Sequence, residues 1–211
     1  KIGIVGEATL SHAQISTIDR APITGAFAID AEGNTSAGAS AKSVINYSFG
    51  EGVTLSSEPT YIHVAVPAGE YDELYVTLYD KANGVMYATV KANETNTLKA
   101  GKLRTFKSNI SYAATDKVVV IKNEADLKAF AAVAATTTSD VVLANDITLT
   151  EAWTPIEGYA GTFSGNGYAI KGLTAPLFGT TSASFKGLHL EGANIVETAN
   201  PNVGALARAI V

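Results

Sequence analysis

Apolar and polar residues alternate through much of the first half of the chain, which is the pattern of half-buried β-strands. Residues 61–66 and 74–79 both alternate in this way, and Pro67 ends the first run because proline cannot donate to a strand ladder. An Asn83-Gly84 turn then leads into a return strand over residues 85–90. The pattern therefore predicts a β-hairpin in the middle of an antiparallel sheet.

Further short strands are expected on both sides of this hairpin. Residues 23–29 and 44–49 have strand character, and a loop rich in Gly, Ser and Ala separates them over residues 31–43. Downstream, a turn at residues 98–102 leads into a predicted strand over residues 103–110. Turn signals about ten residues apart are typical of a β-sandwich or a barrel.

The pattern changes after residue 115, where one amphipathic helix is predicted over residues 123–135. Asn123 is a good N-cap, and Leu127 and Phe130 lie on the apolar face. We expect this helix to cover the end of the repeating segment that follows, with both side chains buried near Val142 or Ile147.

The rest of the chain repeats a short apolar β segment with glycine at its corners. The segments are residues 141–149, 161–173 and 185–192. Ile147, Ile170 and Leu190 occupy equivalent places in them, about 20 residues apart. Because each segment cannot bury its own apolar face, the repeat predicts a solenoid in which successive turns stack.

These repeats resemble the GLUG family of glycine-rich β-helix repeats. The resemblance rests on Trp153-Thr154-Pro155-Ile156, on the run from Gly161 to Leu173 with its Gly165-Asn166-Gly167, and on Leu177-Phe178-Gly179. Glu157 stands where that family has glycine, and Ser164 where it has aspartate. The resemblance spans residues 117–211 and implies a parallel β-helix of the kind found in large secreted or surface adhesin-like bacterial proteins. Trp153 is then expected to be a packing residue.

The first half is similar to the fimbrillin-like domains of Bacteroidales bacteria. The similarity rests on Pro22-Ile23-Thr24-Gly25-Ala26-Phe27, on the strand before Pro67, on the hairpin, and on Leu98-Lys99-Ala100-Gly101-Lys102-Leu103. Those domains are β-sandwiches of cell-surface lipoproteins and pilus subunits. The expected fold is therefore mainly β: a fimbrillin-like β-sandwich over residues 1–115, then the first rungs of a parallel β-helix with one capping α-helix over residues 116–211. Because the last residues are apolar, we expect this β-helix to be truncated.

Composition and charge exclude several classes of function. Fifteen Lys and Arg against twenty Asp and Glu give a net charge of −5, which argues against a nucleic-acid binder. The chain has no Cys, which excludes disulfides, thiolate metal sites and a cysteine nucleophile. No apolar run reaches the roughly 18 residues that a membrane span needs. No catalytic residue, metal ligand or cofactor is predicted.

Three sets of residues are candidates for chemistry or binding. Charged residues on the predicted rungs do not recur on one face, as a polysaccharide-cleaving β-helix would require; they are Asp146, Glu151, Glu157, Lys171, Lys186 and Glu191. The histidines His12, His63 and His189 have no metal-ligand spacing and are expected at the surface. Tyr75, Tyr79 and Tyr87 share the polar face of the hairpin and are the candidate interaction surface, for sugars or a protein partner.

The sequence thus predicts a non-enzymatic, exported protein of the cell surface or outer membrane, adhesin-like or associated with fimbriae. Its expected partners are other surface or pilus subunits, or host or bacterial glycans and proteins. Three readings stay open: a structural or adhesive protein, a polysaccharide-active enzyme or glycan-binding module on the same β-helix, and a pilus subunit joined by strand donation.

Overall fold

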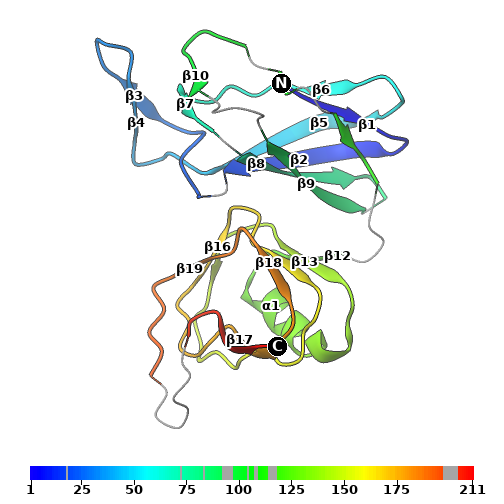
Figure 1. Ribbon diagram of the computed structural model, residues 1–211, viewed down its shortest axis with the longest axis vertical. Coiled ribbons are helices and arrows are strands. Elements are labelled where there is room, and N and C mark those ends of the chain that lie inside the picture. Colours follow the sequence, from blue (N-terminus) through cyan, green and yellow to red (C-terminus); the bar gives the residue numbers. More distant parts are fainter. Residues whose placement is uncertain are drawn as a thin grey trace. The chain divides into compact units, whose positions relative to one another are not determined.

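A computed structural model gives the structure of the chain and describes residues 1–17, 19–71, 73–82, 84–91, 97–103, 105–106, 109–113, 118–196 and 204–211. The described chain is mainly β, with one α-helix, α1 (Glu124–Ala131), and one 3₁₀ turn, η1 (Ala134–Thr136). It divides into two compact units, residues 1–116 and 117–211, and each is described by itself (Figure 1).

Unit 1 contains short and long strands that pair mostly in antiparallel fashion. They are β1 (Ile2–Val5), β2 (Thr9–Thr17), β3 (Phe27–Ile29), β4 (Thr35–Ala37), β5 (Val44–Thr54), β6 (Thr60–Ile62), β7 (Gly69–Glu70), β8 (Glu73–Asp80), β9 (Val85–Lys91), β10 (Thr97–Leu98) and β11 (Ile110–Ser111). The largest sheet has the order β5-β2-β8-β9, and a second has the order β11-β1-β6. Small pairs β3-β4 and β10-β7 complete the unit.

Both main sheets of unit 1 contribute to one apolar core. Strands β2, β8 and β9 supply Leu10, Ala13, Ile15, Leu74, Val76, Leu78 and Val90, and strands β1, β6 and β11 supply Ile2, Ile4, Ile62 and Ile110. Strand β2 has a β-bulge between Leu10 and His12, where its register with both neighbours shifts. The bulge brings Leu10 and Ala13 to the same face although they are three residues apart.

The predicted hairpin is confirmed, because β8 and β9 pair with Tyr79 opposite Val85. Asp80 holds the turn: its Oδ1 accepts hydrogen bonds from the backbone N–H of Ala82 (2.8 Å) and Gly84 (2.7 Å). Asn83, which was expected to set the turn geometry, lies outside the described residues. The Tyr112 hydroxyl donates to Asp80 Oδ2 (2.9 Å), which ties the end of the unit to this hairpin.

Two strand predictions and one loop prediction in unit 1 are wrong in extent. The run predicted over residues 61–66 is a strand only to Ile62, and Val64 and Val66 instead line a cavity. Of the strand predicted over residues 103–110, only its last residue lies in a described strand, β11. The loop predicted over residues 31–43 contains β4, because Phe27–Ile29 folds back and pairs with it.

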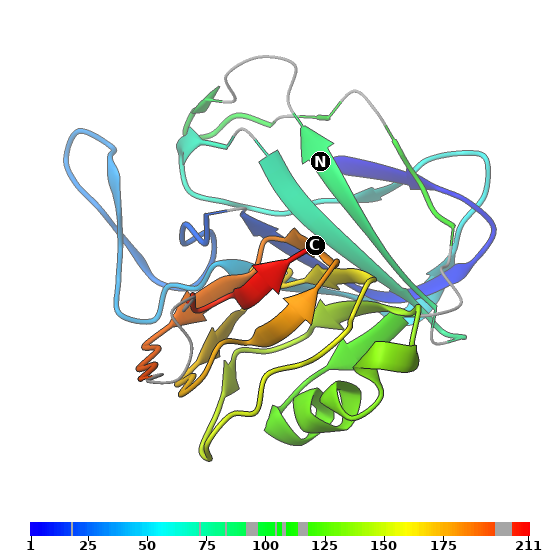
Figure 2. The same ribbon diagram turned by 60° about the horizontal axis from the view of Figure 1, so that its bottom comes forward.

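Unit 2 is built from short strands that pair in parallel. They are β12 (Val118–Ile121), β13 (Asp140–Leu143), β14 (Ile147–Thr148), β15 (Thr162–Ser164), β16 (Ala169–Lys171), β17 (Phe178–Thr181), β18 (Ser184–Lys186), β19 (His189–Glu191) and β20 (Ala207–Ile210). The ladders run β12-β13-β15-β18, β14-β16-β19 and β17-β20. Figure 2 shows these strands in successive layers, with α1 beside the green strands at one end.

The expected alignment of the repeat is confirmed. Ile147 pairs with Ile170, and Ile170 pairs with Leu190, all in parallel register. Side-chain hydrogen bonds span a similar separation: Asp140 Oδ1 accepts from the Thr162 N–H, 22 residues later, at 3.0 Å. The described strands of this unit pair only with each other and not with those of unit 1.

One glycine-rich corner of the repeat needs its residues for backbone reasons, and one strand glycine lies against a neighbouring side chain. Asn166 and Gly167 both have positive φ (51° and 78°), a conformation that asparagine and glycine tolerate best. The Asn166 side chain also donates to the Leu143 carbonyl of the preceding layer (3.3 Å). At Gly179 any side chain would collide with the carboxylate of Glu157.

The helix begins as predicted and ends earlier. Asn123 Oδ1 accepts from the Asp126 N–H (2.9 Å), as an N-cap does. The predicted extent, residues 123–135, is too long: α1 ends at Ala131, and the chain tightens into η1. This tightening turns Ala134 into the core. The burial of Leu127 and Phe130 is confirmed, in the cluster that also contains Ile147.

Aromatic rings form the centre of unit 2. Phe130 of α1 packs edge to face on Tyr159 with ring centroids 5.0 Å apart, and Phe163 packs in the same way on Phe178 at 5.5 Å. The Tyr159 hydroxyl lies within hydrogen-bond distance of the carbonyl oxygens of Ser139 and Thr162, each at 2.9 Å, and donates to them. Trp153 is buried as expected and donates its Nε1–H to the Leu177 carbonyl (3.1 Å).

Replacing Leu127 with alanine tests how far unit 2 depends on α1. Leu127 is fully buried, so Leu127→Ala is expected to lower the free energy of unfolding by about 2 to 5 kcal/mol. Trp153 is the only Trp of the chain, and its fluorescence in denaturant melts reports on this unit alone. The matched control is Val133→Ala, at a position 52% exposed, with an expected change within about 0.5 kcal/mol. Equal effects of the two variants would contradict the prediction.

The buried phenol of Tyr159 predicts a loss of stability at high pH. Burial, and then the negative charge of Asp140, raise its pKa above the ordinary value of about 10. The folded chain therefore holds this proton more tightly than the unfolded chain. The resulting stability is present below about pH 10 and is lost as the pH rises above it. Trp153-monitored melts should show this fall, and Tyr159→Phe should make it smaller.

The control for this alkaline effect is Tyr112→Phe, in unit 1, which should leave the Trp153-monitored fall unchanged. The pKa values of Lys128 and Lys171 are also raised, by their carboxylate partners, but they titrate in both proteins and cancel in the comparison. An identical pH profile for wild type and Tyr159→Phe would refute the assignment.

Candidate functional site

The three tyrosines proposed as an interaction surface lie on one face of the β8-β9 hairpin. On β8, Tyr75 lies two residues before Thr77 and Tyr79 lies two residues after it. Thr77 pairs with Tyr87 on β9. Tyr87 is therefore the diagonal neighbour of both other tyrosines. The expectation that the three share the face opposite the aliphatic side chains is confirmed.

Tyr79 nevertheless does not belong to an open binding surface, which corrects the prediction for this residue. Only 7% of it is exposed, and its ring stacks on His12 with centroids 4.1 Å apart and planes 8° apart. Its hydroxyl donates to Gln14 Oε1 (2.7 Å), and the Gln14 amide donates to Asn46 Oδ1 (3.0 Å). Tyr79 thus links β8 to β2, and through Gln14 to β5.

Tyr75 and Tyr87 are half-buried and retain part of their ring surface. Burial, followed by the nearby charge of Glu73, raises the pKa of Tyr75. Each of these side chains combines a hydrogen-bonding hydroxyl with an apolar ring, a combination common in protein and sugar contacts. The candidate surface is reduced to these two rings.

Three charged residues of unit 2 that were expected not to share one face, Asp146, Lys171 and Glu191, lie together across neighbouring strands, which corrects that expectation. Lys171 Nζ lies 2.9 Å from Asp146 Oδ2 and 3.2 Å from Glu191 Oε2, and Asp146, then Glu191, raises the pKa of Lys171. Asp146 Oδ1 also accepts from the Ala169 N–H (2.9 Å). These carboxylates hold neighbouring strands together.

A second group of charged residues joins α1 to the segment at residues 150–151. Lys128 Nζ lies 2.6 Å from Glu151 and 3.1 Å from Glu124. The Thr150 hydroxyl donates to Glu124 Oε2 (2.7 Å), and this hydrogen bond is the main reason why the pKa of Glu124 is lowered. Elsewhere in the unit, Glu157 accepts from the Thr180 N–H (2.9 Å).

The histidines lie apart within their units. His12 stacks on Tyr79, and His63 packs at a tilt on Tyr61 with ring centroids 6.3 Å apart. His12 and His63 are exposed, as expected, whereas His189 is half-buried on β19. In the part of the chain that the structure describes, no three His, Cys, Asp or Glu residues are grouped to hold a metal ion.

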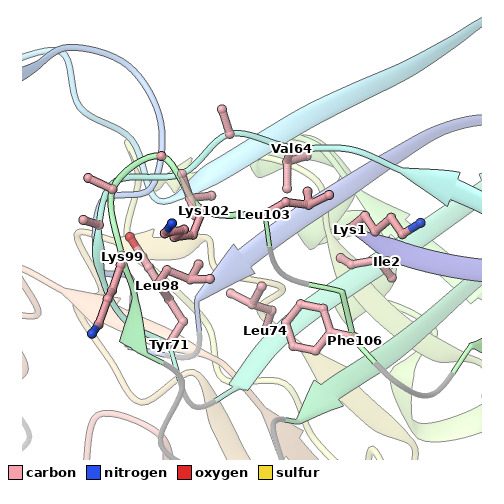
Figure 3. Close-up of a pocket in the computed structure, with 15 residues that line it drawn as sticks. Lys1, Ile2, Val64, Tyr71, Leu74, Leu98, Lys99, Lys102, Leu103 and Phe106 are labelled. Atoms are coloured by element: carbon pink, nitrogen blue, oxygen red, sulfur yellow. The ribbon is translucent and has the colours of Figure 1, made fainter.

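A cavity of about 450 Å³ in unit 1 is a site that the sequence analysis missed (Figure 3). Its described walls are mainly apolar and come from four segments. These are Ile2 at the start of β1, residues 64–66 and Ala68 after β6, Tyr71 and Leu74 around the start of β8, and residues 98–103 with Phe106. The volume falls within the about 300 to 1,000 Å³ typical of small-molecule sites.

Among the described residues that line this cavity, the charged ones are all lysines: Lys1, Lys99 and Lys102. Lys99 and Lys102 flank a turn in which the Lys102 N–H donates to the Lys99 carbonyl (3.2 Å) and Gly101 has positive φ (68°). The Lys1 ammonium is engaged elsewhere, over the Tyr61 ring at 3.9 Å from its centroid. The sequence signal was the turn at residues 98–102, with its two lysines between Leu98 and Leu103.

Known proteins give no further guidance to this chain. Searches of protein families, of curated proteins and of solved structures find no match to it. None of the helices in the described ranges has both the length and the apolar character that crossing a membrane requires.

The hydrogen bond from Tyr79 to Gln14 predicts a structural cost for losing one hydroxyl. Tyr79→Phe leaves the Gln14 oxygen without this donor in a buried place, and should lower the stability of unit 1 by about 1 to 3 kcal/mol. Amide hydrogen exchange in β2 and β8 measures this loss. Tyr61→Phe, at an exposed tyrosine of the same unit, should change exchange little. Equal protection in both variants would show that Tyr79 is not needed to hold the sheet.

Proposed function

We propose that this chain is part of a non-enzymatic, exported protein of the bacterial cell surface, adhesin-like or associated with fimbriae. In this proposal unit 1 is a fimbrillin-like β-sandwich that serves as a stalk. Unit 2 is the start of a GLUG-type parallel β-helix that presents an interaction surface. The proposal rests chiefly on one observation, the parallel register of Ile147, Ile170 and Leu190 across three layers.

The pairing within unit 2 supports the β-helix part of the proposal. Three parallel ladders recur in the same order along the chain, and their apolar side chains share one core. Glu157, which departs from the GLUG pattern, is compatible with it, because its carboxylate accepts from Thr180 over the glycine at position 179. The two sheets of unit 1 that share one core support the sandwich in the same way.

The use of the charged side chains favours a structural or adhesive role over catalysis. A glycan-cleaving site needs two carboxylates that face a substrate and are placed for proton transfer. Asp146, Glu124 and Glu157 instead accept backbone N–H groups or pair with lysine or arginine. These carboxylates bind neighbouring segments of the chain, which supports the proposal of a non-catalytic scaffold.

The partners proposed for this scaffold are other surface or pilus subunits, or glycans and proteins of a host or of other bacteria. Cell-surface or outer-membrane localisation follows from the two family resemblances. Within unit 1, the half-buried rings of Tyr75 and Tyr87 are the proposed contact surface. The competing functions, a polysaccharide-active enzyme and a subunit joined by strand donation, predict different outcomes in the same experiment.

A glycan and surface-protein array probed with the purified chain tests this function. We expect retention of at least one glycan or surface protein and no release of reducing ends or unsaturated sugars from a polysaccharide panel. If the tyrosine surface makes the contact, the double variant Tyr75→Ala, Tyr87→Ala should weaken retention about tenfold or more, since buried tyrosines dominate many interfaces. Tyr61→Ala is the matched control, at an exposed tyrosine of the same unit.

The outcomes separate the competing functions. Sugar release from any polysaccharide would overturn the non-enzymatic assignment. Concentration-dependent polymers of the chain, seen by sedimentation, would favour strand donation instead. Retention that survives the double tyrosine change would place the contact outside these two rings.

A further inference from the structure

The cavity of unit 1 has a charge that differs from that of the chain as a whole. Acidic residues outnumber basic ones, with a net charge of −5, yet among the described residues of the lining there are three lysines and neither Asp nor Glu. The remaining lining is mostly aliphatic or aromatic, including Leu74, Leu98 and Phe106. An apolar chamber with cations at its mouth is complementary to an apolar molecule with an anionic head.

From this geometry we propose that the cavity binds a single-chain anionic amphiphile, an acyl or alkyl chain that ends in a carboxylate or a phosphate. The hydrocarbon chain lies among Ile2, Val64, Leu74 and Phe106, and the head lies beside Lys102. This binding site is independent of the surface role proposed above, since it uses neither the tyrosine rings nor unit 2.

Volume and wall chemistry favour a hydrocarbon chain over a peptide. At about 450 Å³ the cavity is near the small end of the range for small-molecule sites, which suits one chain rather than two. The Tyr71 hydroxyl, a polar group of the wall, already donates to the Pro67 carbonyl (3.0 Å). A buried peptide would bring amide groups that need partners in the wall, whereas a hydrocarbon chain needs none.

The placement of the lysines selects Lys102 as the residue that binds the head. In Figure 3 the Lys102 side chain lies among the other lining side chains, whereas the Lys99 ammonium points away from them. Both side chains are exposed, so their charges stay hydrated at the mouth while the chain of the ligand is buried. Leu103, 76% exposed beside Lys102, supplies an apolar rim that a bound chain would cover.

Titration calorimetry with three ligands that share one tail tests the proposal. The ligands are dodecanoate, dodecyl phosphate and dodecyltrimethylammonium, each kept below its micelle concentration and added to the full chain. We expect one site for each anion and binding of the cation at least tenfold weaker. Whichever anion binds more tightly identifies the head, a fatty acid or a phosphorylated lipid.

Variants at exposed positions locate the site without disturbing the core. Lys102→Glu should weaken dodecanoate binding at least tenfold, and Leu103→Ser at least threefold. Lys42→Glu makes the same charge change at an exposed lysine outside the cavity lining and should alter binding less than twofold. Unchanged amide exchange in β2 and β8 confirms that each variant is folded.

Three results would overturn the proposal. They are the absence of saturable binding of either anion, equal binding of the cation, and equal losses for Lys102→Glu and Lys42→Glu. An extended apolar peptide with a blocked carboxyl end that binds where dodecanoate does not would assign the cavity to a protein partner instead. Each of these is distinct from the array experiment, whose result does not depend on the cavity.

Discussion

Unit 2 depends on one constraint: strands of two to four residues cannot bury their apolar side chains alone. Each strand becomes stable only when the next layer places an equivalent side chain on it, as Ile170 does between Ile147 and Leu190. The charged and polar groups follow from this arrangement. Asp140, Asp146 and Asn166 reach across to a neighbouring layer because that is where unpaired backbone groups lie. The aromatic rings of Phe130, Tyr159 and Phe163 are buried in the core between the stacked strands.

The repeat and the hairpin could be predicted from the sequence because both are local or periodic signals. The alignment of Ile147 with Ile170 needs only the repeat length, and the pairing of β8 with β9 needs only their alternation and a turn. The helix start at Asn123 was equally local. Its end was not, because Ala134 turns into the core of the folded unit and this burial overrides the helical pattern of the alanine-rich segment.

Other features of unit 1 are set by tertiary structure. Strand β2, central to the main sheet, was not predicted from alternation. The bulge after Leu10 shifts the alternation of apolar and polar residues by one position. Val64 and Val66 alternate like a strand, yet they line a cavity with residues far along the chain. Tyr79 looks like an exposed aromatic in the pattern, and only the stacked His12 and the Gln14 oxygen show why it is buried. The cavity itself joins four segments, and no single stretch of sequence contains it.

The way unit 1 closes has a consequence for how the chain is made. Strand β1, at the start of the unit, pairs in parallel with β11, almost at its end. During synthesis β1 can pair with β6 early, but the sheet is complete only when β11 has left the ribosome, and pairing across so long a separation is slow. Unit 2 is different, since each new layer finds its partner about 22 residues back and can be added as it emerges. One chain thus combines a part that folds only when complete with a part that grows step by step, and the first of these is the one that leaves unpaired strand edges exposed for longest.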